Sequence, residues 1–219
     1  MSAPVIAPSR PRSPLVTLKS VAFSVLGLVA ALFIAKYVFH YYLNYNPAVF
    51  GDFWPRPRRV ALLIHVSCGT VALLTGPWQF SRRLRQRHLG LHRLTGRVYL
   101  VAVALGALAS FYLACTTTPW AWGFGVAMLG VAWLTTSSMA YYAIRQRQIS
   151  VHREWMVRSY VVTFAFVTFR ILYDYPPTSY LLPEPDRAVA AVWACWALPL
   201  LATEVILQLK SMRNRAPQK

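Results

Sequence analysis

The chain has 219 residues, of which 57% are apolar, and its formal net charge is +17. Its basic residues alternate with long apolar runs, which is typical of a multi-spanning membrane protein and argues against a nucleic-acid partner. The three cysteines form neither a C-x-x-C nor a C-x-x-C-H motif, which excludes a covalently attached haem and a thioredoxin-like redox pair.

Six apolar segments are long enough to cross a bilayer, which takes about 20 residues of α-helix. We number them spans 1 to 6, and they cover residues 21–43, 60–80, 95–115, 120–144, 155–173 and 188–209. The sequence therefore predicts an all-α polytopic membrane protein. Residues 1–18 are expected to form a disordered cytoplasmic N-terminus, 19–210 a single six-helix membrane domain, and 211–219 a basic cytoplasmic tail.

The distribution of basic residues predicts the orientation of these spans. With the N-terminus in the cytoplasm, 17 of the 23 Lys and Arg residues fall on the inner side. The positive-inside rule then predicts a protein of the cell inner (plasma) membrane with both termini in the cytoplasm. Anionic lipid headgroups would be the partners of the basic loops.

One basic string occurs twice, sixty residues apart, in the two cytoplasmic loops. LRQRHLGLHR begins at Leu84 and IRQRQISVHR at Ile144, with five of ten positions identical. Both copies connect an inward span to an outward one, so the repeat predicts two parallel hairpins, spans 2–3 and 4–5, that form a four-helix core. His92 and His152 become equivalent positions at the inner ends of spans 3 and 5.

These two histidines are the leading candidates for a cofactor site. Neutral imidazole binds metal and haem iron, and helical bundles build cofactor sites from facing side chains. His92 and His152 could supply both axial ligands of a b-type haem. The neighbouring Arg97 and Arg158 could bind its propionates or another anionic group. The alternatives are another metal, although zinc usually requires three or four protein ligands, or histidines that only cap their helices or contact lipid headgroups.

Ionisable residues within the spans form a second group of candidates. A charge at the bilayer centre costs roughly 3 kcal/mol on insertion scales, so it requires a partner or a function. His65 and Gln79 share one helical face of span 2, and Arg170 lies near the outer end of span 5. We expect His65, Gln79 and Arg170 to line a secondary polar pocket. The role of His40, at the outer end of span 1, stays open.

Ion pairs are the competing explanation for the charged members of this group. Asp174 lies one helical turn after Arg170 and could pair with it. Glu204, in the inner third of span 6, could meet either Arg97 or Arg158.

Three strings, HVSCGTVALLTGPWQF, HRLTGRVYL and HREWMVRSYVVTFAFVTFR, resemble a family of bacterial membrane proteins catalogued as domain of unknown function 2306. The similarity covers about residues 60–175 and implies a multi-pass membrane protein with no established activity. The architecture also resembles the cytochrome b561 type, which implies a four-helix core and one haem between histidines of helices 3 and 5. The second haem of that type requires a histidine on span 4, but the residue sixty positions after His65 is Gly125.

Two functions remain open. The leading hypothesis is a b-type haem redox protein that exchanges electrons with a quinone or another small carrier, and the paired His-Arg sequences favour it. The alternative is a non-redox transporter or membrane accessory protein that binds a small solute or lipid in an intramembrane pocket, and the absence of histidine from span 4 favours it. Whether the protein is an enzyme is left open.

Overall fold

The computed structural model describes residues 25–174 and 182–215, and the expected disordered segment 1–18 lies outside them. Every regular element in these ranges is helical, which confirms the all-α prediction. Six helices in the described ranges are long and apolar enough to cross a membrane, as the sequence predicted: Val25–Leu43, Arg56–Phe80, Leu89–Cys115, Trp120–Arg145, Ile149–Asp174 and Asp186–Asn214.

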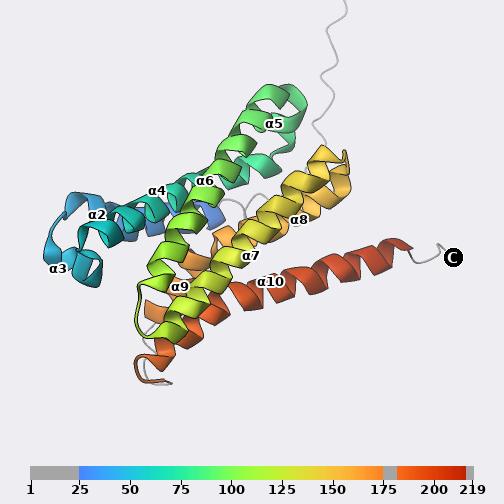
Figure 1. Cartoon of the computed structure of the whole chain (residues 1–219). Helices are drawn as coiled ribbons and strands as arrows, with labels where there is room; N and C mark the ends of the chain where they lie inside the picture. The colour runs from blue at the N-terminus through green and yellow to red at the C-terminus, as the bar shows by residue number, and fades with distance from the viewer. Residues whose placement is uncertain (1–24, 175–181, 216–219) are drawn as a thin grey trace, which may run out of the picture.

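Figure 1 shows the arrangement of the elements. After the helical residues 25–33 come η1 (Ile34–Val38, a π-helix), α2 (Phe39–Leu43), α3 (Pro47–Phe50), η2 (Gly51–Phe53, a 3-10 helix), α4 (Arg56–Phe80), α5 (Arg82–Arg87), α6 (Leu89–Cys115), α7 (Trp120–Arg145), α8 (Ile149–Thr163), α9 (Ala165–Asp174) and α10 (Asp186–Arg215).

Several helices extend beyond the apolar segments from which they were predicted. The third begins at Leu89 and the fifth at Ile149, six residues earlier than expected in each case, so both include the repeated histidines. The last continues to Arg215, into the segment expected to be a tail. Basic side chains continue these helices because Arg and Lys are good helix formers whose charged ends can reach the headgroup region.

The core is a four-helix bundle of α4, α6, α7 and the α8–α9 pair. α4 packs along α6, α6 along α7 and α7 along α8. α8 also contacts α4, which completes the four-helix arrangement: the Tyr160 hydroxyl of α8 donates to the Leu73 carbonyl of α4 at 3.1 Å. A side chain at Gly76 would overlap the Tyr160 ring, so glycine permits the close approach of α4 and α8.

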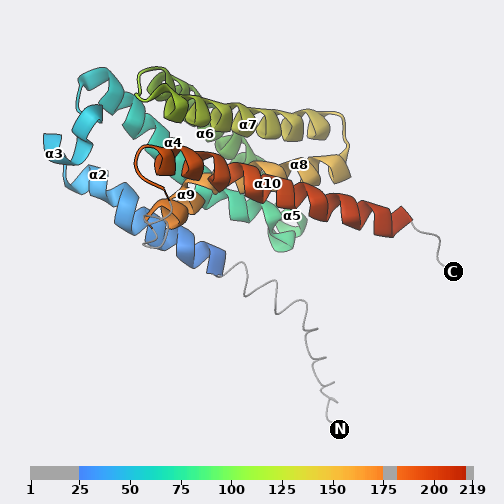
Figure 2. The same cartoon turned by 90° about the horizontal axis from the view of Figure 1, so that it is seen from below.

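Span 1 and α10 lie outside this bundle. Figure 2 shows span 1 beside α4 and α9, where Ile34 and Val38 pack against Leu73 and Val167. α10 contacts α7, α8 and α9. Apolar side chains on the outward faces are exposed, among them Leu108 at 61%, as expected for surfaces that contact lipid tails.

Two local irregularities lie where span 1 meets the bundle. Span 1 changes from α- to π-helix at Ile34–Val38. Span 5 is interrupted at Phe164, between the end of α8 and the start of α9. π-Helical turns occur frequently at functional sites, and residues from both irregular segments line the same cavity.

Candidate functional site

A hydrogen-bonded network of buried side chains connects α6, α7 and α8. The Tyr99 hydroxyl lies 2.6 Å from Ser159 Oγ and 2.7 Å from Thr163 Oγ1. Ser137 Oγ lies 2.7 Å from Ser159 Oγ, and Trp133 Nε1 donates to Thr163 Oγ1 at 2.8 Å. These bonds fix the rotation of the three helices about their own axes, because buried polar groups are costly to leave unpaired.

The network determines where the two repeated histidines point. His92 and His152 each lie seven residues before a member of the hydrogen-bonded pair Tyr99 and Ser159. Seven residues are nearly two helical turns, so each histidine lies on the same helix face as its partner, about 10 Å further along the bundle. The His152 ring is also close enough to His92 to interact with it electrostatically. The structure therefore places the two histidines at the same end of the core, within electrostatic range of each other.

The hydrogen bonds of these histidines are unequal. His152 Nδ1 lies 2.8 Å from the Ala140 carbonyl, which can only accept, so Nδ1 carries the hydrogen. Nε2 of the neutral His152 ring then has a free lone pair, as in most metal-ligating histidines. His92 Nδ1 is buried and has no hydrogen-bond partner in the described structure. A ligand that supplied a partner would remove the cost of that burial.

The two predicted arginines point to different neighbours. Arg158, with a side chain 11% exposed, donates from Nε and Nη2 to Glu204 Oε2 at 2.8 and 2.6 Å. This is one of the two pairings that the sequence suggested for Glu204. Arg97 is exposed and lines a shallow groove of about 380 Å³ between α4 and α6. The repeat spacing of sixty aligns Arg97 with Val157, so Arg158 lies one residue past the equivalent position and its side chain is rotated by about 100°.

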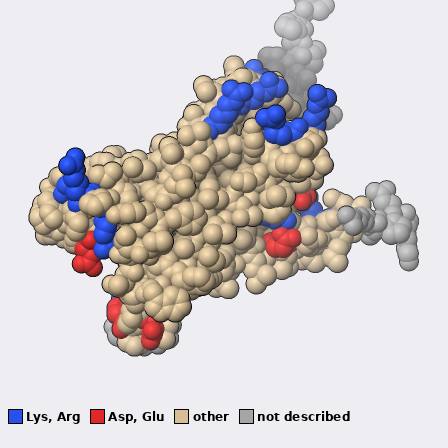
Figure 3. All heavy atoms as spheres, in the orientation of Figure 1, with Lys and Arg blue, Asp and Glu red and all other residues tan. Residues whose placement is uncertain are grey.

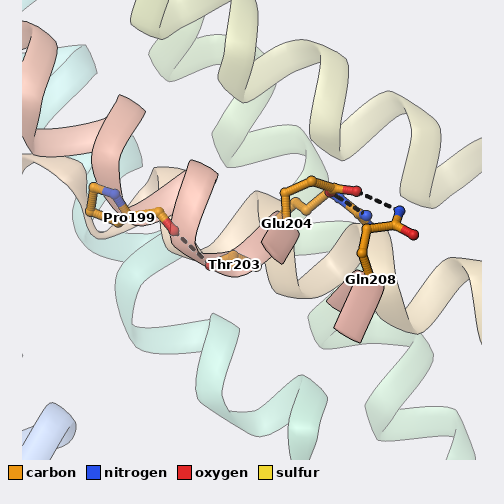
Figure 4. Close-up of polar contacts among 5 residues, drawn as sticks. Pro199, Thr203, Glu204 and Gln208 are labelled. Atoms are coloured by element: carbon orange, nitrogen blue, oxygen red, sulfur yellow. Dashed lines mark hydrogen bonds and ion pairs between the residues drawn. The ribbon is translucent and has the colours of Figure 1, made fainter. Parts of the chain in front are cut away.

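Figure 4 shows the polar contacts of Glu204 and its neighbours on α10. Gln208 Nε2 donates to Glu204 Oε1 at 2.8 Å, so both carboxylate oxygens of Glu204 are bonded. Thr203 Oγ1 donates to the Pro199 carbonyl at 2.7 Å one turn earlier. Arg158 also stacks over the Trp155 ring at 4.8 Å from its centroid. Its charge is thus already paired within the protein.

Other arginines lie within electrostatic range of His92 instead. Arg85 and Arg93 interact electrostatically with His92, and Arg153 with Arg85. Partial burial lowers the pKa of the Arg85 guanidinium, and the charges of Arg153 and Arg82 lower it further. Figure 3 shows Lys and Arg gathered over α5 and the nearby ends of α7 and α8. This crowding of positive charge would be relieved by a bound anion.

A cavity of about 230 Å³ lies between span 1, α4, α7 and the α8–α9 pair. Two of the three residues expected in a secondary polar pocket, His65 and Arg170, line it. Gln79 lies elsewhere, about 21 Å along α4 from His65 at 1.5 Å per residue. There its Nε2 donates to Thr95 Oγ1 at 2.8 Å. Most of the cavity wall is apolar or aromatic, including Phe33, Tyr41, Phe53, Trp122, Trp133 and Phe166.

His65 is the buried polar group of this wall. It is 9% exposed, and its Nδ1 lies 2.9 Å from the Gly106 carbonyl, so Nδ1 donates and Nε2 of the neutral ring is an acceptor. Phe166 and Trp133 meet the imidazole edge to face, with ring centroids 5.0 and 6.4 Å away. None of the described side chains donates to Nε2 of His65.

Arg170 is held in the wall by neighbouring residues. Its guanidinium lies 4.8 Å from the centroid of the Tyr37 ring, and its Nη1 lies 3.6 Å from Asp174 Oδ1. The Tyr37 hydroxyl donates to the other carboxylate oxygen of Asp174. The ion pair suggested by the sequence is therefore present, and its arginine also lines the cavity.

Sequence reasoning missed several residues of these sites. Ser137 and Trp133 lie on α7. This helix has no histidine and no charged residue in its interior, so its sequence gave no indication of a site. Arg85 lies within the repeated string, and that repeat was the signal that could have identified it as a candidate site residue. Within residues 25–174 and 182–215, no three His, Cys, Asp or Glu side chains come together as a metal site.

Comparison with known proteins places the chain in a family. No curated protein and no solved structure matches the sequence. The sequence pattern of the family DUF2306, described as a predicted membrane protein, matches residues 62–207, which is more than half of the chain. The matched region runs from α4 into α10 and includes both histidines of the pair and His65. The chain therefore belongs to the DUF2306 family of predicted membrane proteins.

Proposed function

We propose that the protein is a membrane redox protein that binds one b-type haem between His92 and His152 and exchanges electrons with a quinone or another small carrier. The observation that carries this proposal is the 2.6 Å contact between Tyr99 and Ser159. It fixes α6 and α8 with those faces together, and both histidines continue the same faces toward one end of the bundle. The resemblance to the cytochrome b561 architecture points in the same direction.

The residues present suit a haem in three respects. His152 has its Nδ1 bonded to a carbonyl, so its Nε2 is the free nitrogen. His92 has a buried nitrogen without a partner. Arg85, Arg93 and Arg153 could pair with propionates, and they suit that role better than Arg158, which is bonded to Glu204. A bound haem would supply one-electron chemistry, and the protein would supply its ligands and the charge around it.

An absorption spectrum of the purified protein, expressed with ample haem, tests this proposal. The wild type should show a Soret band that shifts on reduction with dithionite. His92→Ala or His152→Ala should abolish it, because each removes one axial ligand. His88→Ala is the matched control, since His88 is exposed and lies four residues before His92. A colourless wild-type protein, or a spectrum that survives both substitutions, would contradict the proposal.

The charge distribution supports a proposal for the location of the protein. We propose that the protein lies in the plasma membrane with its basic loops and both termini in the cytoplasm. The Lys and Arg gathered over α5 and the ends of α7 and α8 support this orientation, because positive charge near short loops is retained inside. Anionic lipid headgroups would neutralise much of this surface.

The cavity between span 1 and the bundle favours a second candidate function. A non-redox transporter or accessory protein would need a place for a small solute or lipid, and this space of about 230 Å³ contains the buried His65. The spectrum separates the candidates, because a protein without a cofactor has no Soret band. Ligand binding in the cavity without haem would then support the second function.

A further inference from the structure

We infer that the cavity beside span 1 binds an apolar ring compound that carries a hydroxyl group, a phenol or a hydroquinone, whose hydroxyl donates to Nε2 of His65. The inference rests on the cavity alone and holds for either candidate function. It differs from the haem proposal in its place, because His65 lies on α4 and the histidine pair on α6 and α8.

The need for a hydroxyl follows from the state of His65. Its Nδ1 is committed to the Gly106 carbonyl at 2.9 Å, so Nε2 offers a lone pair and no hydrogen. The oxygen of a carbonyl or ether ligand is also an acceptor, so it could not form a hydrogen bond with Nε2. A ring hydroxyl presents a donor and would satisfy this nitrogen, whose imidazole ring packs among aromatic side chains.

The size and walls of the cavity favour a single ring. A dry apolar cavity of about 150 Å³ is enough for benzene, so about 230 Å³ accommodates one substituted ring. Phe166 and Trp133 already surround the imidazole edge to face. Aromatic walls of this kind pack well against another ring, and the apolar lining matches ligands that partition into the bilayer.

The electrostatics favour a neutral ligand. Arg170 is the charged side chain of the lining, but Asp174 lies 3.6 Å from its guanidinium, and the Tyr37 ring covers it. An anionic ligand would have to compete with Asp174 for Arg170. We therefore assign recognition of the ligand to His65 and not to Arg170.

Calorimetric titration of the full-length protein in nanodiscs tests the inference, with empty nanodiscs to subtract partition into lipid. The probes are methylhydroquinone, kept reduced, para-cresol, and the dimethyl ether of methylhydroquinone, which has the same ring without donors. Both hydroxylated probes should bind saturably, and the ether about tenfold more weakly, which corresponds to one buried hydrogen bond. Binding of methylhydroquinone but not para-cresol would narrow the class to hydroquinones.

Two substitutions with matched controls locate the site. His65→Phe should weaken the hydroxylated probes about tenfold and leave the ether unchanged, whereas His40→Phe, at an exposed position, should change nothing. Gly69→Leu should abolish binding of all probes, because Gly69 lines the cavity and a Cβ there meets no atom within 4 Å. Gly27→Leu, equally unobstructed but on the exposed face of span 1, is its control.

Leucine is a better helix former than glycine, so Gly69→Leu should fold at least as stably as the wild type. The inference is overturned by binding no greater than to empty nanodiscs, by equal affinity for hydroquinone and ether, or by full binding to Gly69→Leu. None of these readouts involves haem absorbance, so this inference and the haem proposal can fail separately.

Discussion

The hydroxyl of Tyr99 lies 2.6 Å from that of Ser159, and the two residues are sixty positions apart. Sixty is also the spacing of the repeated loop sequence and of His92 and His152. Equivalent residues of a two-fold repeat contact each other only next to the symmetry axis. The contact therefore indicates a pseudo-two-fold axis between the hairpins α4–α6 and α7–α9. We predict that the two hairpins superpose after a rotation of about 180° about this axis.

Replacing Tyr99 should measure how much this contact contributes to stability. Tyr99→Phe removes a hydroxyl that lies within hydrogen-bond distance of both Ser159 and Thr163. We expect the free energy of unfolding to fall by about 1–3 kcal/mol, because buried polar groups lose a partner. Denaturant unfolding in detergent micelles measures the change. Tyr112→Phe, at an exposed position on the same helix, is the control, and equal losses for the two variants would contradict a special role for Tyr99.

The ion pair between Arg158 and Glu204 should be important for the attachment of α10. Glu204→Leu leaves the mostly buried Arg158 guanidinium without its carboxylate. We expect the free energy of unfolding of this variant to fall by about 2 kcal/mol. This value is below the range for fully buried pairs because the Glu204 side chain is 41% exposed. Unfolding monitored by tryptophan fluorescence gives the loss.

The double variant Arg158→Met with Glu204→Leu provides the control for that prediction. It removes both charges and should recover most of the stability, since replacing a paired charge by apolar side chains is often neutral. If the double variant is as unstable as Glu204→Leu alone, the loss comes from packing and not from an unpaired charge.

Chemical labelling should show the orientation of the loops. In a background without native cysteines, Gln86→Cys and Gln146→Cys introduce exposed thiols at equivalent places in the two repeated loops. Both should resist an impermeant maleimide in intact cells and react after lysis. A separate variant that keeps only Cys115, exposed at the opposite end of α6, is the control, and it should react in intact cells. Labelling of the loops but not of Cys115 would invert the topology.

The connection before α10 should respond to pH through Glu184. Burial would raise the pKa of this carboxyl, but hydrogen bonds from Tyr173 and Arg187 outweigh it and hold the pKa below the usual 4.5. A depressed pKa gives stability that is present above about pH 4.5 and is lost as the pH falls through the folded-state value. Because the pair is exposed, the contribution should be about 0.5 kcal/mol or less.

The measurement compares the wild type with Glu184→Gln across the acid range. The variant should be slightly less stable near neutral pH, by about the contribution above, and the difference should vanish in acid. Glu154→Gln, the same substitution at an exposed position on α8, is the control for the loss of a surface carboxylate. A difference between wild type and Glu184→Gln that persists unchanged at low pH would exclude the carboxylate as its cause.

Much of this architecture could be predicted because its signals are long or repeated. Six apolar runs identify six spans, and the loop repeat identifies His92 and His152 as equivalent. The depth of a residue was harder to predict than its face. His65 and Gln79 share a helical face, and helical phase predicts only this direction around the helix axis. It does not show that the two residues lie about 21 Å apart along the axis.

Other features have little or no signal in the sequence. Span 5 is interrupted at Phe164, although no proline or glycine near this position predicts a break in the helix. Arg158 differs from Arg97 in its surroundings because it lies one residue past the equivalent position. This turns its side chain toward α10, where only the tertiary structure supplies Glu204. Trp133 donates to Thr163 across the bundle, a contact that depends on helix rotation and not on residue type.

The hydrogen bond between Tyr99 and Ser159 also bears on how a duplicated hairpin can diverge. A homodimer of identical hairpins must place the same residue on both sides of its axis, where two tyrosines would collide and two serines would leave a void. Fusing the copies into one chain removes that restriction. One half can then carry the large side chain and the other the small one, while two positions that need identical chemistry, such as His92 and His152, are free to stay alike.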